Sequence, residues 1–137
     1  MLEKLCHDNI IRLVRYGFWD LENSYILLEY AERGSLFDIV SKRGPMTETE
    51  AKIHFRGIVE GLEHMHNQGV YHCDIKLENI GLNTYSEVKI IDFGQATKDL
   101  LTSVLAGTEG YQSPEQVKKG EYCPKHSDIF TLGICLF

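Results

Sequence analysis

The strongest structural signal in the chain is a helical pattern between Thr47 and Gly69. Thr47 is followed three residues later by Glu50, which forms a capping box. In a capping box, two side chains satisfy backbone N–H groups that have no partner at the start of a helix. Apolar residues then recur at helical spacing: Ala51, Phe55, Ile58, Val59, Leu62 and Met65. A glycine after such a run is typical of a helix end, so an amphipathic helix ending near Gly69 is predicted.

The sequence before this helix predicts a β-hairpin. Residues 12–19 mix aromatic and β-branched side chains and predict a strand, and residues 25–30 form a short apolar run. The polar residues 20–23 between them predict a turn. An uninterrupted apolar run is typical of a strand buried on both faces, which is the expectation for the second strand. After a break at Gly34, residues 36–40 predict a short helix.

The sequence after the long helix has a different pattern. Residues 69–94 alternate short apolar runs with polar clusters, which indicates loops and small strands. Residues 128–137 form a nearly uninterrupted apolar stretch behind an acidic residue and predict the start of a buried helix.

Composition and charge exclude several classes of protein. The length of 137 residues suits one domain. A net charge of −6 argues against a nucleic-acid backbone or an anionic membrane as the main partner, because both require a basic face. No stretch approaches the roughly 20 apolar residues of a membrane span. The four cysteines are scattered without a C-x-x-C pair, which favours a reducing compartment over a zinc or disulfide framework. A cytoplasmic or nuclear location is therefore expected.

Two polar clusters contain the residues with catalytic potential. They are residues 72–79, with the sequence HCDIKLEN, and residues 92–94, with the sequence DFG. Phosphoryl transfer requires an oriented nucleophile, divalent metal on the phosphate oxygens and positive charge near the migrating group. Asp74 can accept a hydroxyl proton and Lys76 can neutralise phosphate. Asn79 and Asp92 offer the oxygen ligands that suit magnesium.

Each of these residues has an ordinary structural explanation when it is taken alone. A single His72 is more often a packed core histidine, and Asn79 and Asp92 are common turn residues. Cys73 is interpreted as a passive thiol, because the adjacent carboxylate disfavours the thiolate. The three histidines at 54, 64 and 66 share a helix, but they do not all share a face, and a metal site there is not expected. The functional interpretation depends on the clusters occurring together and in this order.

In this combination, the chain resembles the eukaryotic protein kinases of the serine/threonine type. The two clusters match the family motifs HRDLxxxN and DFG. A lysine two residues after the aspartate is the pattern of serine/threonine-directed members. Four further segments match in the correct order: residues 7–11 (the turn after helix C), 28–31 (gatekeeper and hinge), 107–115 (the substrate-proximal loop and APE motif) and 128–133 (the DxxxxG that opens helix F).

The resemblance implies an α+β fold of the two-lobe protein kinase type, of which the chain contains a part. Residues 1–31 would be the end of helix C, the hairpin and the hinge of the N-lobe. Residues 32–137 would be the first part of the mainly helical C-lobe, as far as helix F. The implied activity of the full-length parent is phosphorylation of serine or threonine in protein substrates, with ATP and Mg²⁺ as cofactors.

The resemblance also implies roles for individual residues. Asp74 would be the catalytic base, Lys76 would contact the γ-phosphate, and Thr108 would support both. Asn79 and Asp92 would bind the metal, and Lys76 and Asn79 would also face the nucleotide.

Other positions would hold adenine or support the site. The backbone groups of Glu29 and Ala31 would hold adenine, and Asp128 would anchor the catalytic loop from below. A regulatory spine would be formed by Leu2, Leu13, His72 and Phe93.

Departures from the family pattern leave a second interpretation open. Cys73 replaces an arginine that pairs with an activation-loop phosphate in many relatives, and Val104 stands at the usual phosphorylated position. Gly81 stands where relatives place an apolar residue beneath adenine. The sequence contains no Gly-rich loop, no ATP-contacting lysine strand and no helix C glutamate, since Glu3 lies at least a turn out of place. The alternative is therefore a non-catalytic kinase-like module that binds partners or binds nucleotide weakly.

Overall fold

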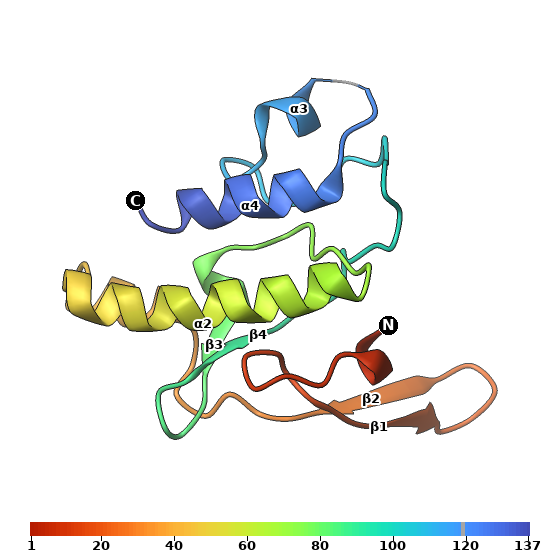
Figure 1. Cartoon of the computed structure of the whole chain (residues 1–137). Coiled ribbons are helices and arrows are strands. Elements are labelled where there is room, and N and C mark those ends of the chain that lie inside the picture. The colour runs from red at the N-terminus through yellow and green to blue at the C-terminus, as the bar shows by residue number, and fades with distance from the viewer. Residues whose placement is uncertain (119) are drawn as a thin grey trace.

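The computed structural model describes residues 1–118 and 120–137, which form an α+β arrangement of helices and small antiparallel sheets (Figure 1). Among these residues, no helix has both the length and the apolar character that crossing a membrane would need. The elements, in chain order, are η1 (Leu2–Lys4), β1 (Leu13–Phe18), β2 (Ser24–Leu28), α1 (Leu36–Arg43), α2 (Glu48–Asn67), η2 (Leu77–Asn79), β3 (Ile80–Leu82), β4 (Val88–Ile90), α3 (Pro114–Val117) and α4 (Pro124–Ile134).

Helix α2 confirms the predicted amphipathic helix. The Thr47 hydroxyl accepts a hydrogen bond from the Glu50 N–H, and the Glu50 carboxylate accepts one from the Thr47 N–H. The helix ends at Asn67, and Gly69 follows with a φ of 66°, a conformation that glycine adopts readily. Three apolar side chains from its periodic face are buried: Ile58, Leu62 and Met65.

Helix α2 packs closely on the short β3–β4 hairpin, which lies at the centre of the core (Figure 1). The strands are antiparallel, with Ile80 opposite Ile90 and Leu82 opposite Val88. The N-terminal segment adds to this hairpin, because the Ile11 N–H donates to the Ile90 carbonyl at 3.0 Å. Helix α4 runs alongside α2, on the opposite side of α2 from the β1–β2 hairpin (Figure 1).

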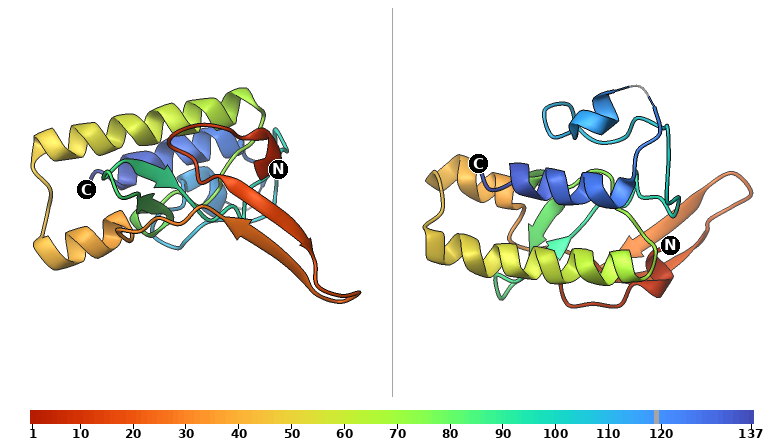
Figure 2. Two further views of the ribbon diagram at one scale, coloured as in Figure 1. Left: turned by 90° about the horizontal axis from the view of Figure 1, so that it is seen from below. Right: turned by 45° about the horizontal axis from the view of Figure 1, so that its top comes forward.

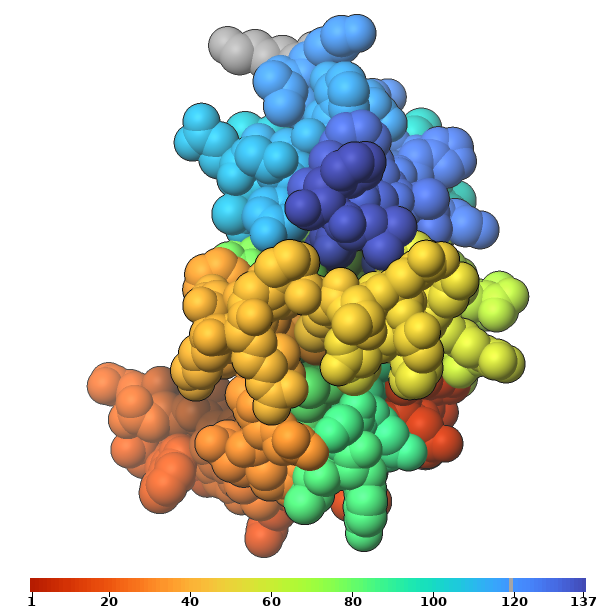
Figure 3. Space-filling view, turned by 90° about the vertical axis from the view of Figure 1, so that its left-hand side faces the viewer, coloured from red at the N-terminus to blue at the C-terminus, as the bar shows by residue number. Residues whose placement is uncertain are grey.

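The β1–β2 hairpin has the predicted antiparallel pairing, from Leu13 opposite Leu28 to Phe18 opposite Ser24. The expectation that the second strand is buried on both faces is wrong. Ile26 and Leu27 are 66% and 51% exposed, and the strand ends at Leu28. An apolar sequence allows a strand to be buried but does not determine whether another element packs against it. Here the two-stranded ribbon projects from the rest of the molecule, so β2 stays exposed (Figures 2 and 3).

The other two predicted helices are present with different bounds or burial. Helix α1 extends to Arg43 and begins at a capping box between Ser35 and Asp38. Helix α4 begins at Pro124, a residue type that suits the first turn of a helix, rather than at Asp128. The prediction that residues 128–137 are buried holds only for one face of α4. Ile129 is 54% exposed, and the final two residues are exposed as well.

Candidate active site

The loop that contains Asp74 is anchored to α4 by a single buried carboxylate. Asp128 is fully buried, and its carboxylate accepts hydrogen bonds from the backbone N–H groups of His72 at 2.9 Å and Cys73 at 2.8 Å. The side chain of His66, from the last turn of α2, lies 2.9 Å from the same carboxylate. These contacts agree with the expected anchoring role of Asp128.

His72 links this loop to the segment that follows β4. Burial lowers the pKa of His72, so the imidazole is held neutral. Its Nε2 lies 2.9 Å from the Ile91 carbonyl, and its Nδ1 accepts the Asp74 N–H at 3.3 Å. A neutral ring with its proton on Nε2 satisfies both contacts. The ring also packs against that of Phe93 in an edge-to-face arrangement, with ring centroids 5.2 Å apart.

Asp74, Thr108 and Lys76 form one hydrogen-bonded group. The Thr108 hydroxyl donates to Asp74 Oδ1 at 2.7 Å and accepts from Lys76 Nζ at 2.7 Å. Lys76 Nζ also lies 3.2 Å from Asp74 Oδ2. The structure therefore brings together the three residues predicted as catalytic, although their segments are more than thirty positions apart in the sequence. Asp74 is only 6% exposed, and both of its carboxylate oxygens accept hydrogen bonds, Oδ1 from Thr108 and Oδ2 from Asn79.

Asn79 and Asp92 present oxygen atoms from two adjacent segments. Asn79 Nδ2 donates to the Asp74 carbonyl at 2.8 Å, which leaves the amide oxygen of Asn79 for another partner. The Ile91 N–H donates to the Asn79 carbonyl at 2.9 Å and joins the two segments just before Asp92. Asp92 has a φ of 60°, a strained conformation for a non-glycine residue that is often found at functional sites.

The chemistry of these two donors fits Mg²⁺. Mg²⁺ prefers hard oxygen ligands and is commonly held by one or two protein side chains together with water and phosphate oxygens. Asn79 and Asp92 supply one amide oxygen and one carboxylate. In the part of the chain that the structure describes, no group of three or more histidine, cysteine, aspartate or glutamate side chains is arranged to hold a metal.

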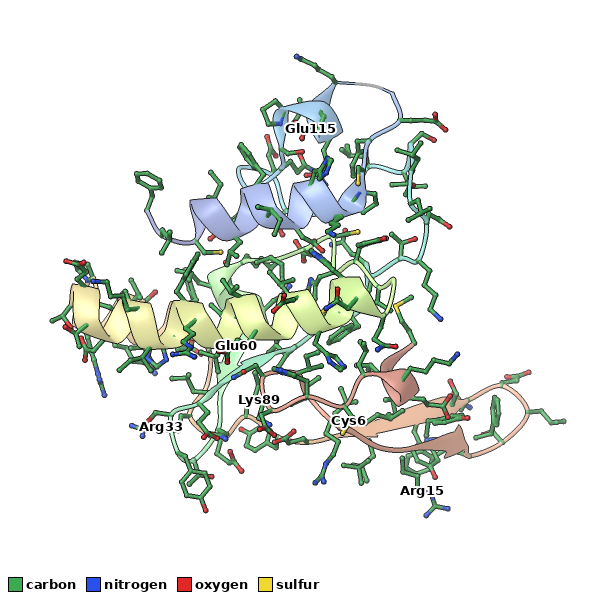
Figure 4. The ribbon with its side chains drawn as sticks, viewed as in Figure 1. Cys6, Arg15, Arg33, Glu60, Lys89 and Glu115 are labelled. Carbon is green, nitrogen blue, oxygen red and sulfur yellow. The ribbon has the colours of Figure 1, made fainter. Side chains whose placement is uncertain are left out.

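The predicted hinge is fixed by an ion pair that the sequence did not reveal. Glu29 Oε1 lies 2.9 Å from Lys89 Nζ, and Glu29 Oε2 accepts the Arg12 N–H at 3.1 Å. Burial acts to raise the pKa of Glu29, but the bonds from Lys89 and Arg12 outweigh it and lower this pKa. Lys89, labelled in Figure 4, is mostly buried on β4. In the sequence, the only indication of a special role for Lys89 was its position within the apolar run at 88–91.

Gly81 has a structural reason for its departure from the family pattern. A Cβ atom at this position would lie 2.6 Å from the Cβ of Ala31, which is closer than real side chains approach. Glycine therefore allows β3 to pass directly beneath the hinge residue Ala31.

A cleft of about 740 Å³ separates the β1–β2 hairpin from the DFG segment. Its walls include three of the four residues predicted to form a spine, Leu2, Leu13 and Phe93. The fourth, His72, contacts Phe93 from the side of the catalytic loop. Asp92 also lines this cleft, so the predicted metal ligand faces the space beneath the hairpin.

Cys73 is buried next to Asp74 and is chemically passive. Burial, followed by the charge of Asp128, raises the pKa of Cys73 to about 12. Its thiol lies 3.7 Å from the Tyr71 carbonyl. Burial, rather than the adjacent Asp74, is therefore the main factor that disfavours the Cys73 thiolate.

Comparisons with known proteins identify the family. The whole chain, residues 1–137, matches the family model for the protein kinase domain. Serine/threonine-protein kinase GIN4 of Saccharomyces cerevisiae is 38% identical over 141 residues, which cover 100% of this chain and 12% of GIN4. Serine/threonine-protein kinase PLK2 of Mus musculus is 38% identical, covering 97% of this chain and 20% of PLK2.

A plant relative gives a similar match. CBL-interacting protein kinase 33 of Oryza sativa is 34% identical, covering 96% of this chain and 30% of that protein. The chain thus spans less than a third of the length of each of these relatives. Both the motifs and the arrangement of the described residues agree with these matches. The chain belongs to the protein kinase domain family, with serine/threonine-protein kinases among its relatives.

Proposed function

We propose that the protein containing this domain transfers the γ-phosphoryl group of ATP to serine or threonine hydroxyls of protein substrates. The observation that carries the proposal is the group formed by Asp74, Thr108 and Lys76, with both contacts to the Thr108 hydroxyl at 2.7 Å. This group offers a buried, oriented carboxylate beside a positive charge, as phosphoryl transfer requires. The names of GIN4 and PLK2 support serine or threonine as the acceptor.

Asp74 is the base in the proposed reaction. The substrate hydroxyl donates a hydrogen bond to the Asp74 carboxylate, which orients the oxygen toward the γ-phosphorus. A bond forms between this oxygen and phosphorus, and the bond from phosphorus to the β–γ bridging oxygen breaks. The hydroxyl proton passes to Asp74, and ADP leaves with the bonding electrons. Lys76 lies beside this path and offsets the negative charge of the γ-phosphate.

The remaining site residues bind the nucleotide. Asn79 and Asp92 would hold Mg²⁺, which neutralises phosphate charge and orients the phosphate groups when it is bound. The carbonyl of Glu29 and the backbone of Ala31 would hold adenine, because the Glu29 N–H already donates to the Arg12 carbonyl at 2.9 Å. A cytoplasmic or nuclear location is part of the same proposal.

A non-catalytic kinase-like module is the second candidate. Its support is that Cys73 in the catalytic loop and Val104 in the activation segment depart from the family pattern. Such a module would bind a partner, or bind nucleotide weakly, without transferring phosphate. It predicts no ATP-dependent phosphorylation by the full-length protein at any concentration of Mg²⁺.

Two substitutions test the assigned roles in the full-length protein. We expect Asp74→Asn to lower kcat on a serine-containing peptide by at least a hundredfold, because general-base catalysis contributes about 10²–10⁴-fold. The KM for ATP should change little, since Asp74 contacts the acceptor. Asp92→Asn should instead weaken Mg²⁺-dependent nucleotide binding, measured by titration calorimetry, as well as lower kcat.

Asp8→Asn provides a matched control, because Asp8 is an exposed turn residue outside the site. It should leave both kcat and nucleotide binding unchanged. Near-normal turnover of Asp74→Asn would show that Asp74 is not the base. Unchanged Mg²⁺-dependent binding in Asp92→Asn would remove Asp92 from the metal site.

A further inference from the structure

A second series of hydrogen bonds runs from α4 toward Asp74 by a different route. Asp128 holds the catalytic loop, and its neighbour Ser127, which is 1% exposed, has its hydroxyl 3.1 Å from the Ser113 hydroxyl. Ser113 is fully buried and is the N-cap of α3. Two adjacent residues of α4 are thus connected to the site by different routes. Asp128 is connected through the catalytic loop and Ser127 through α3.

Gln116 continues this route from α3 to the activation segment, residues 92–115. Its side chain is nearly buried, with 5% of the residue exposed. Its Oε1 accepts the Ser113 N–H at 2.8 Å, and its Nε2 donates to the Ala106 carbonyl at 3.3 Å. Gln112 Nε2 donates to the same carbonyl at 3.0 Å. One amide therefore caps a helix and holds the segment that precedes Thr108.

The residue between Ala106 and Thr108 allows little adjustment. Gly107 has a φ of 84°, and a Cβ atom there would lie 2.9 Å from the Cys73 carbonyl. Its N–H donates to Gln95 Oε1 at 2.6 Å. Since only one tightly placed residue separates Ala106 from Thr108, a shift of the Ala106 carbonyl would move the Thr108 hydroxyl away from Asp74.

The bonds on this route are neutral. Cys73 offers no positive charge next to the segment, and Val104 is an exposed apolar residue without a hydroxyl. Ordering a loop by pairing a phosphate with arginine requires both of the groups that these residues lack. Side-chain amides and hydroxyls hold the segment instead, including the Tyr122 hydroxyl, which donates to the Val104 carbonyl at 2.8 Å.

We propose that Gln116 is a positioning residue for phosphoryl transfer. Its amide fixes the Ala106–Gly107 segment, and through it the Thr108 hydroxyl, against Asp74 and Lys76. This inference rests on the proposed function, because it gives Gln116 a role in orienting the base of that reaction. In this proposal Gln116 acts through Thr108 and is not itself a contact for substrate or nucleotide.

Gln116→Glu in the full-length protein separates positioning from helix capping. Glutamate keeps an acceptor for the Ser113 N–H, so the α3 cap is retained, but it loses the donor to the Ala106 carbonyl and places an oxygen there instead. We expect kcat to fall about tenfold or more, equivalent to ~1.4 kcal/mol of transition-state stabilisation. The KM for ATP and the melting temperature should change little. Gln68→Glu, the same substitution at an exposed residue, should leave kcat unchanged.

A double-mutant cycle with Thr108→Ala tests the route of the effect. Thr108→Ala alone should lower kcat, and adding Gln116→Glu should then cost little more, since its effect passes through the removed hydroxyl. A merely structural role would lower kcat by the same factor in both backgrounds. Ser127→Ala, which removes the link to Ser113 with a small change in volume, should show a weaker decrease with the same dependence on Thr108.

The outcomes are distinct. Unchanged kcat in Gln116→Glu, or effects of Gln116→Glu and Thr108→Ala that multiply, would overturn the positioning role and leave the proposed function intact. If Gln116→Glu does not fold, a double-mutant cycle of Ser127→Ala with Thr108→Ala tests the positioning role by the same criteria. A wild-type protein that transfers no phosphate would overturn the proposed function and this inference with it.

Discussion

Cys73 directly precedes the proposed base, yet its surroundings make it unreactive. A thiol reacts as the thiolate, and the raised pKa of about 12 leaves almost none of this form near neutral pH. The backbone of Cys73 has a more active structural role. Its N–H is bound by Asp128, its carbonyl packs against Gly107, and its φ is 65°.

Alkylation should therefore discriminate between the cysteines of the folded protein. At pH 8, iodoacetamide should label the exposed Cys6 and leave Cys73 largely unmodified, because burial disfavours the Cys73 thiolate. Peptide mass spectrometry after timed quenching measures both positions in the same sample. After unfolding in guanidinium, both should be labelled. Equal labelling rates in the folded protein would contradict the description of Cys73.

Sequence reasoning at this scale could name residues in short motifs but not their distant partners. Asp74, Lys76 and Asn79 were predicted because their spacing is itself a signal. The pairing of Glu29 with Lys89 and the bonds from Gln116 to Ala106 were missed. Both join segments whose separation depends on the whole fold, and a glutamine or lysine at such a position resembles an ordinary surface residue.

At the scale of elements, the contact between α2 and β4 determines the core beneath the site. A Cβ atom on Gly57 would lie 2.5 Å from the Val88 side chain, and one on Gly61 would lie 2.9 Å from the Ile90 side chain. The helix itself was predicted because capping and periodicity are local properties. The need for glycine was not, since it depends on what packs against the helix.

Gly57→Ala should consequently destabilise the protein although alanine favours helices. The added methyl group meets Val88 and Asn9, and overpacking of this kind costs about 1–3 kcal/mol, more than the roughly 1 kcal/mol gained in helix propensity. Chemical denaturation of the full-length protein measures the difference. Glu63→Ala, on the exposed face of the same helix, should stay within about 0.5 kcal/mol of the wild type. A neutral or stabilising Gly57→Ala would show that α2 and β4 are less closely packed.

At the scale of the whole molecule, the site is assembled where three parts meet. Helix α4 holds the catalytic loop through Asp128 and α3 through Ser127, and β4 brings Asp92 next to Asn79. The order of motifs was enough to predict the α+β kinase fold. The prediction that the second strand of the β1–β2 hairpin is buried was wrong, because an apolar sequence does not specify which element packs against it. The division into lobes at residue 31 stays a prediction.

The central claim is that the protein transfers phosphate to serine or threonine with Asp74 as the base. The most direct measurement incubates the full-length protein with γ-³²P-labelled ATP, Mg²⁺ and a mixture of serine, threonine and tyrosine peptides, followed by phosphoamino-acid analysis. We predict labelled phosphoserine or phosphothreonine that is lost in Asp74→Asn, while nucleotide binding persists in that variant. Label that appears only on tyrosine, or no label above that of Asp74→Asn from a folded wild-type protein, would contradict the account.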